Sequence, residues 1–290
     1  MAALPLALIL VSAFLHAGWN LLSRRDRAEA GFFMRMLLAI VVVGAGPALL
    51  AEFSRPRLST VGFGLALGSG TCCGLYYLFL MLGYRSGDFS VVYPVARALP
   101  VLLVGVADIL RHRAPGAAGW VGFALVTAGC LLAPHQHLRG LSLAWYKTRA
   151  GLWVVLTALG TVGYTVLDKV AAERITPGFA SALVYGYVFF ATALLVYSVL
   201  CRSFVSGPER GRARWTWCVV GATMDFGAYG LVLWVYQLTD RASYVLAFRQ
   251  VSIVVGVIGG LVLYREKGAA LRLSASLIIT LGLVLIAVLG

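Results

Sequence analysis

The chain has 290 residues, of which 61% are hydrophobic and 12% are charged, whereas soluble globular domains have roughly 45–50% and about 25%. This composition excludes a disordered chain, a nucleic-acid-binding platform and a solvated enzyme surface, and it indicates a protein surrounded by lipid. The net charge of +13 fits loops that face anionic headgroups, so we expect a lipid bilayer and no nucleic acid among the partners.

Ten stretches are long and apolar enough to cross a membrane, because about 20 helical residues span a hydrocarbon core about 30 Å thick. They lie near residues 3–22, 31–51, 60–83, 89–110, 117–133, 149–168, 178–201, 214–238, 242–264 and 270–289. The runs are continuous and lack the alternation of barrel strands. We therefore predict an all-α membrane protein with ten transmembrane helices and short connections.

The first stretch lacks the basic n-region and the small-residue cleavage site of a signal peptide. We expect it to be the first membrane helix.

The sequence contains an internal repeat of five spans. HAGWNLLSR at 16–24 aligns with TVGYTVLDK at 161–169, and further along Tyr77 aligns with Tyr229 and Arg97 with Arg249. We divide the chain into a first repeat at 1–134, a connecting loop at 135–148 and a second repeat at 149–290. An odd number of spans makes the second repeat enter the membrane from the opposite face, so we predict inverted repeats. Such repeats are typical of alternating-access transporters, with the substrate site between them.

Several motifs resemble the EamA repeats of the drug/metabolite transporter superfamily. They are YRSGDFSVVYPVARALPVLLVGVADIL and GWVGFALVTAGCLLA in the first half and DRASYVLAFRQVSIVVGVIGGLVLYREK in the second. HAGWNLLSR and the acidic Glu266 are also similar to the family pattern, whereas Ala114 stands opposite Glu266 in the first half. The resemblance covers nearly the whole chain, and it implies a carrier that exports amino acids, metabolites or toxic compounds.

Two arginines lie well inside predicted spans, Arg97 in the fourth and Arg249 in the ninth. An ionised residue there costs roughly 2.5–3.5 kcal/mol on insertion scales, and Asp225 in the eighth span is the acid nearest the middle of the membrane. We predict that both arginines bind a substrate carboxylate, because guanidinium offers a planar fork of donors. Asp225 would bind an ammonium group, and it is also our candidate for proton coupling.

A structural alternative is that Asp225 pairs with one arginine, while backbone carbonyls near Pro94 and Pro100 satisfy the other. The two prolines also predict a kink beside Arg97, because proline inside a helix removes a backbone hydrogen bond. The ninth span has no proline.

Aromatic and polar residues complete the predicted substrate site. Its apolar or cation-attracting walls are Trp19, Tyr77, Tyr164 and Tyr229. Asn20 shares a helix face with His16, and the pair belongs either to the site or to interhelical hydrogen bonds. Asp108 and Asp168 fall near span ends, where solvated or interface-paired carboxylates are the ordinary case.

The sequence implies no metal and no cofactor. The five cysteines (Cys72, Cys73, Cys130, Cys201 and Cys218) lack CxxC spacing and are expected to be small buried residues. His135 and His137 form an HxH pair without further ligands nearby, and we expect solvated loop histidines.

Two arguments about orientation disagree. The loops on the side of the amino terminus carry seven Lys and Arg residues and those on the other side carry fourteen, which places both termini outside the cytoplasm. The family resemblance implies that both termini are inside.

These observations predict a multi-pass protein of the bacterial inner membrane, a secondary transporter that exports amino acids or related small polar metabolites by alternating access. The alternatives are an organic anion or phosphonate carrier and a multidrug cation efflux protein, which buried positive charge disfavours. A lipid-processing membrane enzyme would need a nucleophile with its base or a metal cluster, and the sequence shows neither, so we expect no enzyme.

Overall fold

A computed structural model describes residues 2–22, 30–55, 57–86, 89–133, 148–204, 214–264 and 269–290. The loop predicted to join the repeats, including His135 and His137, lies outside these ranges apart from Thr148, and so does Glu266.

The described residues form helices in the order that the sequence predicts. The first half contains α1 (Ala3–Leu22), α2 (Ala30–Ser54), α3 (Thr60–Ser86), α4 (Phe89–Leu110) and α5 (Ala117–Leu132). The second half contains α6 (Arg149–Ala172), α7 (Phe179–Phe204), α8 (Trp215–Leu238), α9 (Ala242–Arg249), α10 (Val251–Tyr264) and α11 (Ala269–Leu289). The all-α prediction is confirmed, and the ends of most helices lie within a few residues of the predicted spans.

Seven apolar segments of the described residues are long enough to cross a membrane. They are Gly31–Ser54, Thr60–Ser86, Arg149–Ala172, Phe179–Phe204, Trp215–Leu238, Ala242–Gly259 and Ala269–Leu289. Large apolar side chains on their outer faces are exposed, among them Phe53 at 86% and Leu50 at 74%. Exposure on this scale fits a surface in contact with lipid. The chain is therefore a multi-pass helical membrane protein.

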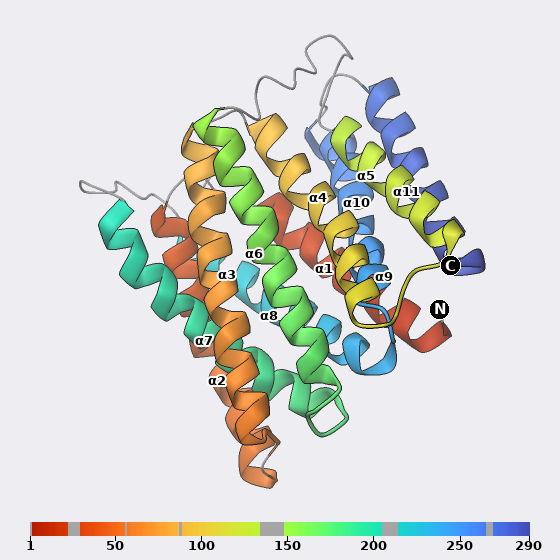
Figure 1. Cartoon of the computed structure of the whole chain (residues 1–290). Helices are drawn as coiled ribbons and strands as arrows, with labels where there is room; N and C mark the ends of the chain where they lie inside the picture. Colours follow the sequence, from red (N-terminus) through yellow and green to blue (C-terminus); the bar gives the residue numbers. More distant parts are fainter. Residues whose placement is uncertain are drawn as a thin grey trace.

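The helices of the two halves pack against each other (Figure 1). The helix α3 packs on α6 and α7, and α1 packs on α8 and α10. The helix α2 packs on α7 and α8, while α4 lies against α5, α6 and α9. This packing brings residues from both halves together inside the bundle.

The helices α5 and α11 form a closely packed pair at one side of the bundle (Figure 1). A Cβ atom on Gly122 would lie 2.8 Å from the Gly282 carbonyl oxygen, and one on Gly282 would lie 2.7 Å from the Gly122 carbonyl oxygen. Only glycine permits so close an approach at both positions, which is how small residues allow helix contact in lipid.

The predicted ninth span is broken into α9 and α10 at Gln250. The Gln250 N–H donates to the Ala247 carbonyl at 2.9 Å, and its side-chain amide donates to the Leu246 and Arg97 carbonyls at 3.3 Å each. These bonds replace part of the interrupted helical pattern. The sequence predicts a kink beside Pro94 and Pro100, and α4 runs through both as one helix. The interruption between α9 and α10 is confined to Gln250, which keeps right-handed helical backbone angles (φ −69°, ψ −11°), and the apolar span Ala242–Gly259 continues through it.

Candidate functional site

A continuous set of contacts joins the predicted site residues inside the bundle. We call Trp19, Tyr77, Arg97, Tyr164, Asp225, Tyr229 and Arg249 the central site; these residues come from α1, α3, α4, α6, α8 and α9. All of them are buried except Arg97, which is partly buried. Asn20 lies at the end of α1, and its side chain is outside the described residues.

Arg249 is a buried cation at the last position of α9. It is 5% exposed, and its Cζ lies 5.4 Å from the centroid of the Tyr229 ring. Its buried Nε has no hydrogen-bond partner, and among the described residues no carboxylate lies within 4.0 Å of the guanidinium. A cation–π contact contributes about 0.5–2 kcal/mol and does not supply an ion-pair partner. The guanidinium is thus disposed to bind an anionic group.

Arg97 has different surroundings. One Nη atom lies 3.0 Å from His16 Nε2, and the other donates to Ser252 Oγ at 3.1 Å. The other ring nitrogen, His16 Nδ1, accepts a hydrogen bond from the Trp19 indole N–H at 3.2 Å. Arg97 is therefore fixed by α1 and by the first turn of α10.

Asp225 in α8 faces both α1 and α3. Its Oδ2 accepts a hydrogen bond from the Tyr77 hydroxyl at 3.2 Å, and its Oδ1 lies 3.7 Å from His16 Nδ1. The Trp19 indole packs edge-on against the same imidazole, with ring centroids 5.3 Å apart. Within the described residues, the structural alternative in which Asp225 forms an ion pair with an arginine is wrong. His16 instead connects Asp225 with Arg97.

Tyr164 completes the connection between the two arginines. Its ring contacts Tyr229 edge-on at 6.1 Å and Tyr76 at 5.9 Å, and Tyr76 contacts Tyr77 at 5.1 Å. The four predicted aromatic residues are therefore parts of one buried cluster, and three of them lie next to a charged group.

Asp168 is a second buried carboxylate, and the sequence analysis did not assign it to the site. It is 1% exposed, and it accepts hydrogen bonds from the hydroxyls of Ser69, Tyr185 and Tyr229. Of the two expected environments, solvated or interface-paired, Asp168 is not solvated, because hydroxyl groups from α3, α7 and α8 surround it. One of those hydroxyls belongs to Tyr229, whose ring forms the cation–π contact with Arg249.

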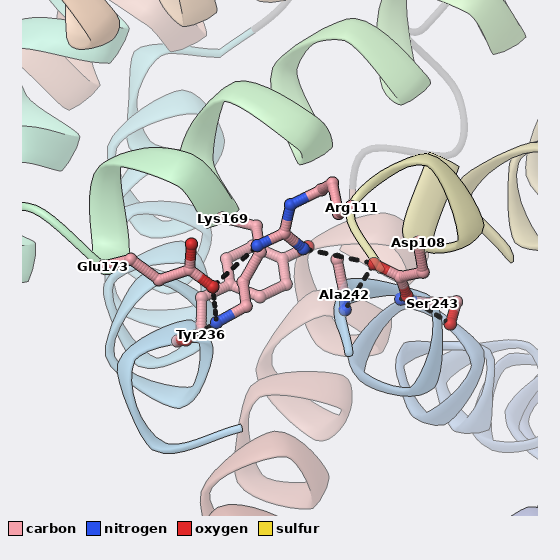
Figure 2. Close-up of polar contacts among 7 residues, drawn as sticks. All are labelled: Asp108, Arg111, Lys169, Glu173, Tyr236, Ala242 and Ser243. Atoms are coloured by element: carbon pink, nitrogen blue, oxygen red, sulfur yellow. Dashed lines mark hydrogen bonds and ion pairs between the residues drawn. The ribbon is translucent and has the colours of Figure 1, made fainter. Parts of the chain in front are cut away.

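Asp108 at the end of α4 is also buried, at 1% exposure. Its Oδ2 accepts hydrogen bonds from the backbone N–H and the hydroxyl of Ser243, and its Oδ1 lies 3.4 Å from the Ala242 nitrogen (Figure 2). These donors are at the first turn of α9, where backbone N–H groups lack helical partners. A carboxylate is also favoured there by the helix dipole.

Ion pairs extend this contact to α6 and α8, as Figure 2 shows. Arg111 lies 3.2 Å from Asp108 and 2.6 Å from Glu173, and Lys169 lies 3.0 Å from Glu173. Lys169 Nζ also donates to the Tyr236 carbonyl at 2.9 Å. We call Asp108, Arg111, Lys169, Glu173 and Ser243 the interhelical network. It joins the ends of α4, α6, α8 and α9 at one end of the bundle.

The charges in this network affect Glu173, which follows α6. Partial burial on its own would raise the pKa of Glu173, but hydrogen bonds and positive charge from Arg111 and Lys169 outweigh that effect. The pKa of this carboxyl is therefore below its ordinary value, and the ion pairs are present at neutral pH.

Comparisons with known proteins identify the fold. No family model matches the chain, and no curated protein matches it. A crystal structure of a protein that is 14% identical superposes with a TM-score of 0.74, and the match covers 100% of this chain and 99% of that chain. At this identity the likeness shows the fold alone. The complete helical arrangement therefore occurs in another protein.

Proposed function

We propose that the chain is a secondary transporter that exports amino acids or related small polar metabolites by alternating access. The observation that carries this proposal is Arg249, a buried guanidinium inside a membrane span with no ion-pair partner within 4.0 Å among the described residues. Ionisable side chains inside membrane spans are costly, and they typically mark substrate or ion pathways.

The packing of the helices supports the inverted repeat. In an inverted repeat, α1, α2 and α3 correspond to α6, α7 and α8. A contact between α3 and α6 then predicts one between α8 and α1, a contact between α3 and α7 predicts one between α8 and α2, and all four contacts occur. The same correspondence turns α4/α6 into α9/α1 and α10/α1, which also occur, and α2/α7 and α5/α11 map onto themselves. This pattern is expected of two related halves around an axis in the membrane plane. It also favours membership of the EamA family.

The charges of the central site support a zwitterionic substrate. Arg249 has donors for a carboxylate, and Asp225 accepts one hydrogen bond from Tyr77 and has further lone pairs for an ammonium group. An organic anion or phosphonate would use Arg249 without Asp225, and this is the second candidate. A cationic drug is disfavoured because Arg249 would repel it.

The proposal is tested by counterflow in proteoliposomes loaded with amino acids, phosphonates or quaternary amines in turn. We expect amino acids to stimulate uptake of a ¹⁴C-labelled amino-acid mixture and Arg249→Gln to lose it. Arg35→Gln is the matched control, since Arg35 lies near a membrane boundary over Trp215 at 5.7 Å. Uptake of a labelled phosphonate that internal phosphonate stimulates, without uptake of labelled amino acids, would favour the second candidate, and equal transport by wild type and Arg249→Gln would contradict both.

The direction of transport is tested separately. Reporter fusions at Gly290 place the carboxyl terminus inside or outside the cytoplasm, which decides between the charge count and the family resemblance. Export requires that cells expressing the protein accumulate less labelled amino acid than cells expressing Arg249→Gln.

A further inference from the structure

Asp168 and Arg249 share one neighbour, Tyr229. The Tyr229 hydroxyl donates to Asp168 in α6, and the Tyr229 ring carries the Arg249 guanidinium at 5.4 Å. Asp168 and Arg249 form no ion pair among the described contacts. A single tyrosine in α8 therefore connects a buried carboxylate with the unpaired cation of the central site.

The Tyr229 ring is held on several sides. Phe189 stacks on it at 4.8 Å with an interplanar angle of 21°, and Tyr164 and Phe190 meet it edge-on at 6.1 Å and 5.6 Å. Stacking on Phe189 occupies one face of the ring, which leaves the other face for Arg249. The hydroxyl hydrogen bond to Asp168 then restricts the remaining movement of the ring in its own plane.

Asp168 is itself held by groups that do not touch Arg249. Ser69 in α3 donates to it, and the Tyr185 hydroxyl in α7 donates to it at 2.9 Å. Hydroxyl donors from α3, α7 and α8 therefore fix the position of the Asp168 carboxylate.

We infer that Asp168 is a positioning residue for substrate binding, which acts through the Tyr229 hydroxyl to hold the Arg249 guanidinium where it binds a carboxylate. This inference rests on the proposed function and adds to it a specific requirement. Binding of the substrate carboxylate depends on Asp168, whereas binding of the ammonium group and the side chain does not. The substrates are accordingly small molecules with a free carboxylate.

The test compares two tyrosines that donate to the same carboxylate. Tyr229→Phe keeps the ring under Arg249 and removes its link to Asp168, whereas Tyr185→Phe removes a hydroxyl from Asp168 and leaves Tyr229 and Arg249 in place. Inhibition of uptake of a ¹⁴C-labelled amino-acid mixture is measured in proteoliposomes with unlabelled L-alanine and with L-alaninamide, which lacks the carboxylate.

We expect Tyr229→Phe to weaken inhibition by L-alanine roughly fivefold or more, the effect of about 1 kcal/mol, and to leave inhibition by L-alaninamide within about twofold. We expect Tyr185→Phe to change neither inhibition by more than about twofold. Thermal unfolding of both purified variants controls for stability, since each loses one buried hydrogen bond of similar kind.

Asp168→Asn provides a second route to the same result. If Asp168 acts through Tyr229, L-alanine inhibits uptake by the double variant Asp168→Asn/Tyr229→Phe no more weakly than it inhibits uptake by either single variant. The reason is that both changes remove the same hydrogen bond between Tyr229 and Asp168. Additive effects would overturn the inference, as would equal effects of Tyr229→Phe and Tyr185→Phe or equal weakening for alanine and alaninamide. Absence of amino-acid uptake by the wild-type protein would overturn the proposed function together with the inference, so the two failures are distinguishable.

Discussion

The carboxylate of Asp108, at the end of α4, accepts hydrogen bonds from both the backbone N–H and the hydroxyl of Ser243, at 2.9 and 2.6 Å. Ser243 lies in the first turn of α9, a helix of 8 residues whose last residue is Arg249. One end of α9 is therefore fixed to the interhelical network, and the other end carries the unpaired cation of the central site.

Replacing Asp108 should destabilise the protein and loosen α9. The Asp108 carboxylate accepts two hydrogen bonds from Ser243 and pairs with the Arg111 guanidinium. Asp108→Asn removes its negative charge, and we expect this to lower the free energy of unfolding by about 2 kcal/mol. Ser243→Ala removes only the hydroxyl donor and should cost about 1 kcal/mol. Thermal unfolding in detergent measures both, and a larger loss in Ser243→Ala than in Asp108→Asn would contradict the assignment.

Arg111 should control the opening of this end of the bundle. Arg111→Gln loses the ion pairs with Asp108 and Glu173, so backbone amides at residues 242–249 should exchange hydrogen for deuterium faster. Arg113→Gln is the matched control, because Arg113 is an exposed arginine in the same loop. Exchange that changes equally in the two variants would show that loop charge and not the ion pairs matters.

The contribution of Glu173 to stability should depend on pH in the acid range only. Its pKa in the folded protein is lowered, so the stabilisation is fully present above the ordinary glutamate pKa of about 4.3. It disappears as the pH falls through the lower folded value. Glu173→Gln should therefore unfold at a lower temperature than wild type at pH 7 and pH 5, and the two proteins should converge in stronger acid. A difference that grows as the pH falls would have the wrong sign.

The two arginines should respond differently to the same substitution. Arg97→Gln removes hydrogen bonds to His16 and Ser252 and should lower the unfolding temperature, since the partners are left buried without a donor. Arg249→Gln removes a buried charge that has no ion-pair partner within 4.0 Å among the described residues, so the unfolding temperature should stay the same or rise. Uptake should nevertheless fall roughly tenfold or more, because hydrogen bonds to a charged group contribute about 1.5–3 kcal/mol.

Proton coupling through Asp225 predicts a dependence on the pH gradient. Asp225→Asn cannot exchange a proton, so uptake in this variant should no longer respond to an imposed gradient, whereas the wild-type protein should respond. Tyr77→Phe serves as control, because it removes the hydrogen bond to Asp225 and leaves the carboxyl group. Identical responses of wild type and Asp225→Asn would exclude Asp225 as the coupling residue.

The helices were predictable from the sequence because membrane spans depend on length and hydropathy, which are local properties. The sequence also singled out Arg97, Arg249 and Asp225, because charge inside a membrane span is costly. The partners of these residues were not predictable. The contacts of His16 with Arg97 and Asp225 depend on the packing of α1 against α8, α9 and α10, and the sequence alone does not specify that packing.

Asp168 was not assigned to the site because its position near the end of a predicted span suggested a solvated or interface-paired carboxylate. Its burial depends on Ser69, Tyr185 and Tyr229 from three other helices. One signal was present in the repeat, since Asp168 lies four residues after Tyr164 in the segment that matches HAGWNLLSR. The interruption at Gln250 was not predictable, because the sequence has no proline or glycine at this position. Hydrogen bonds from the Gln250 side chain stabilise it instead.

The reciprocal contact of Gly122 with Gly282 has a consequence for the motion that the proposed transport would require. Because each glycine backbone touches the other helix, α5 and α11 cannot slide past one another without a steric collision, and they should move as one rigid pair. If the protein alternates access as proposed, the conformational change must occur among the other helices, which would move relative to this pair.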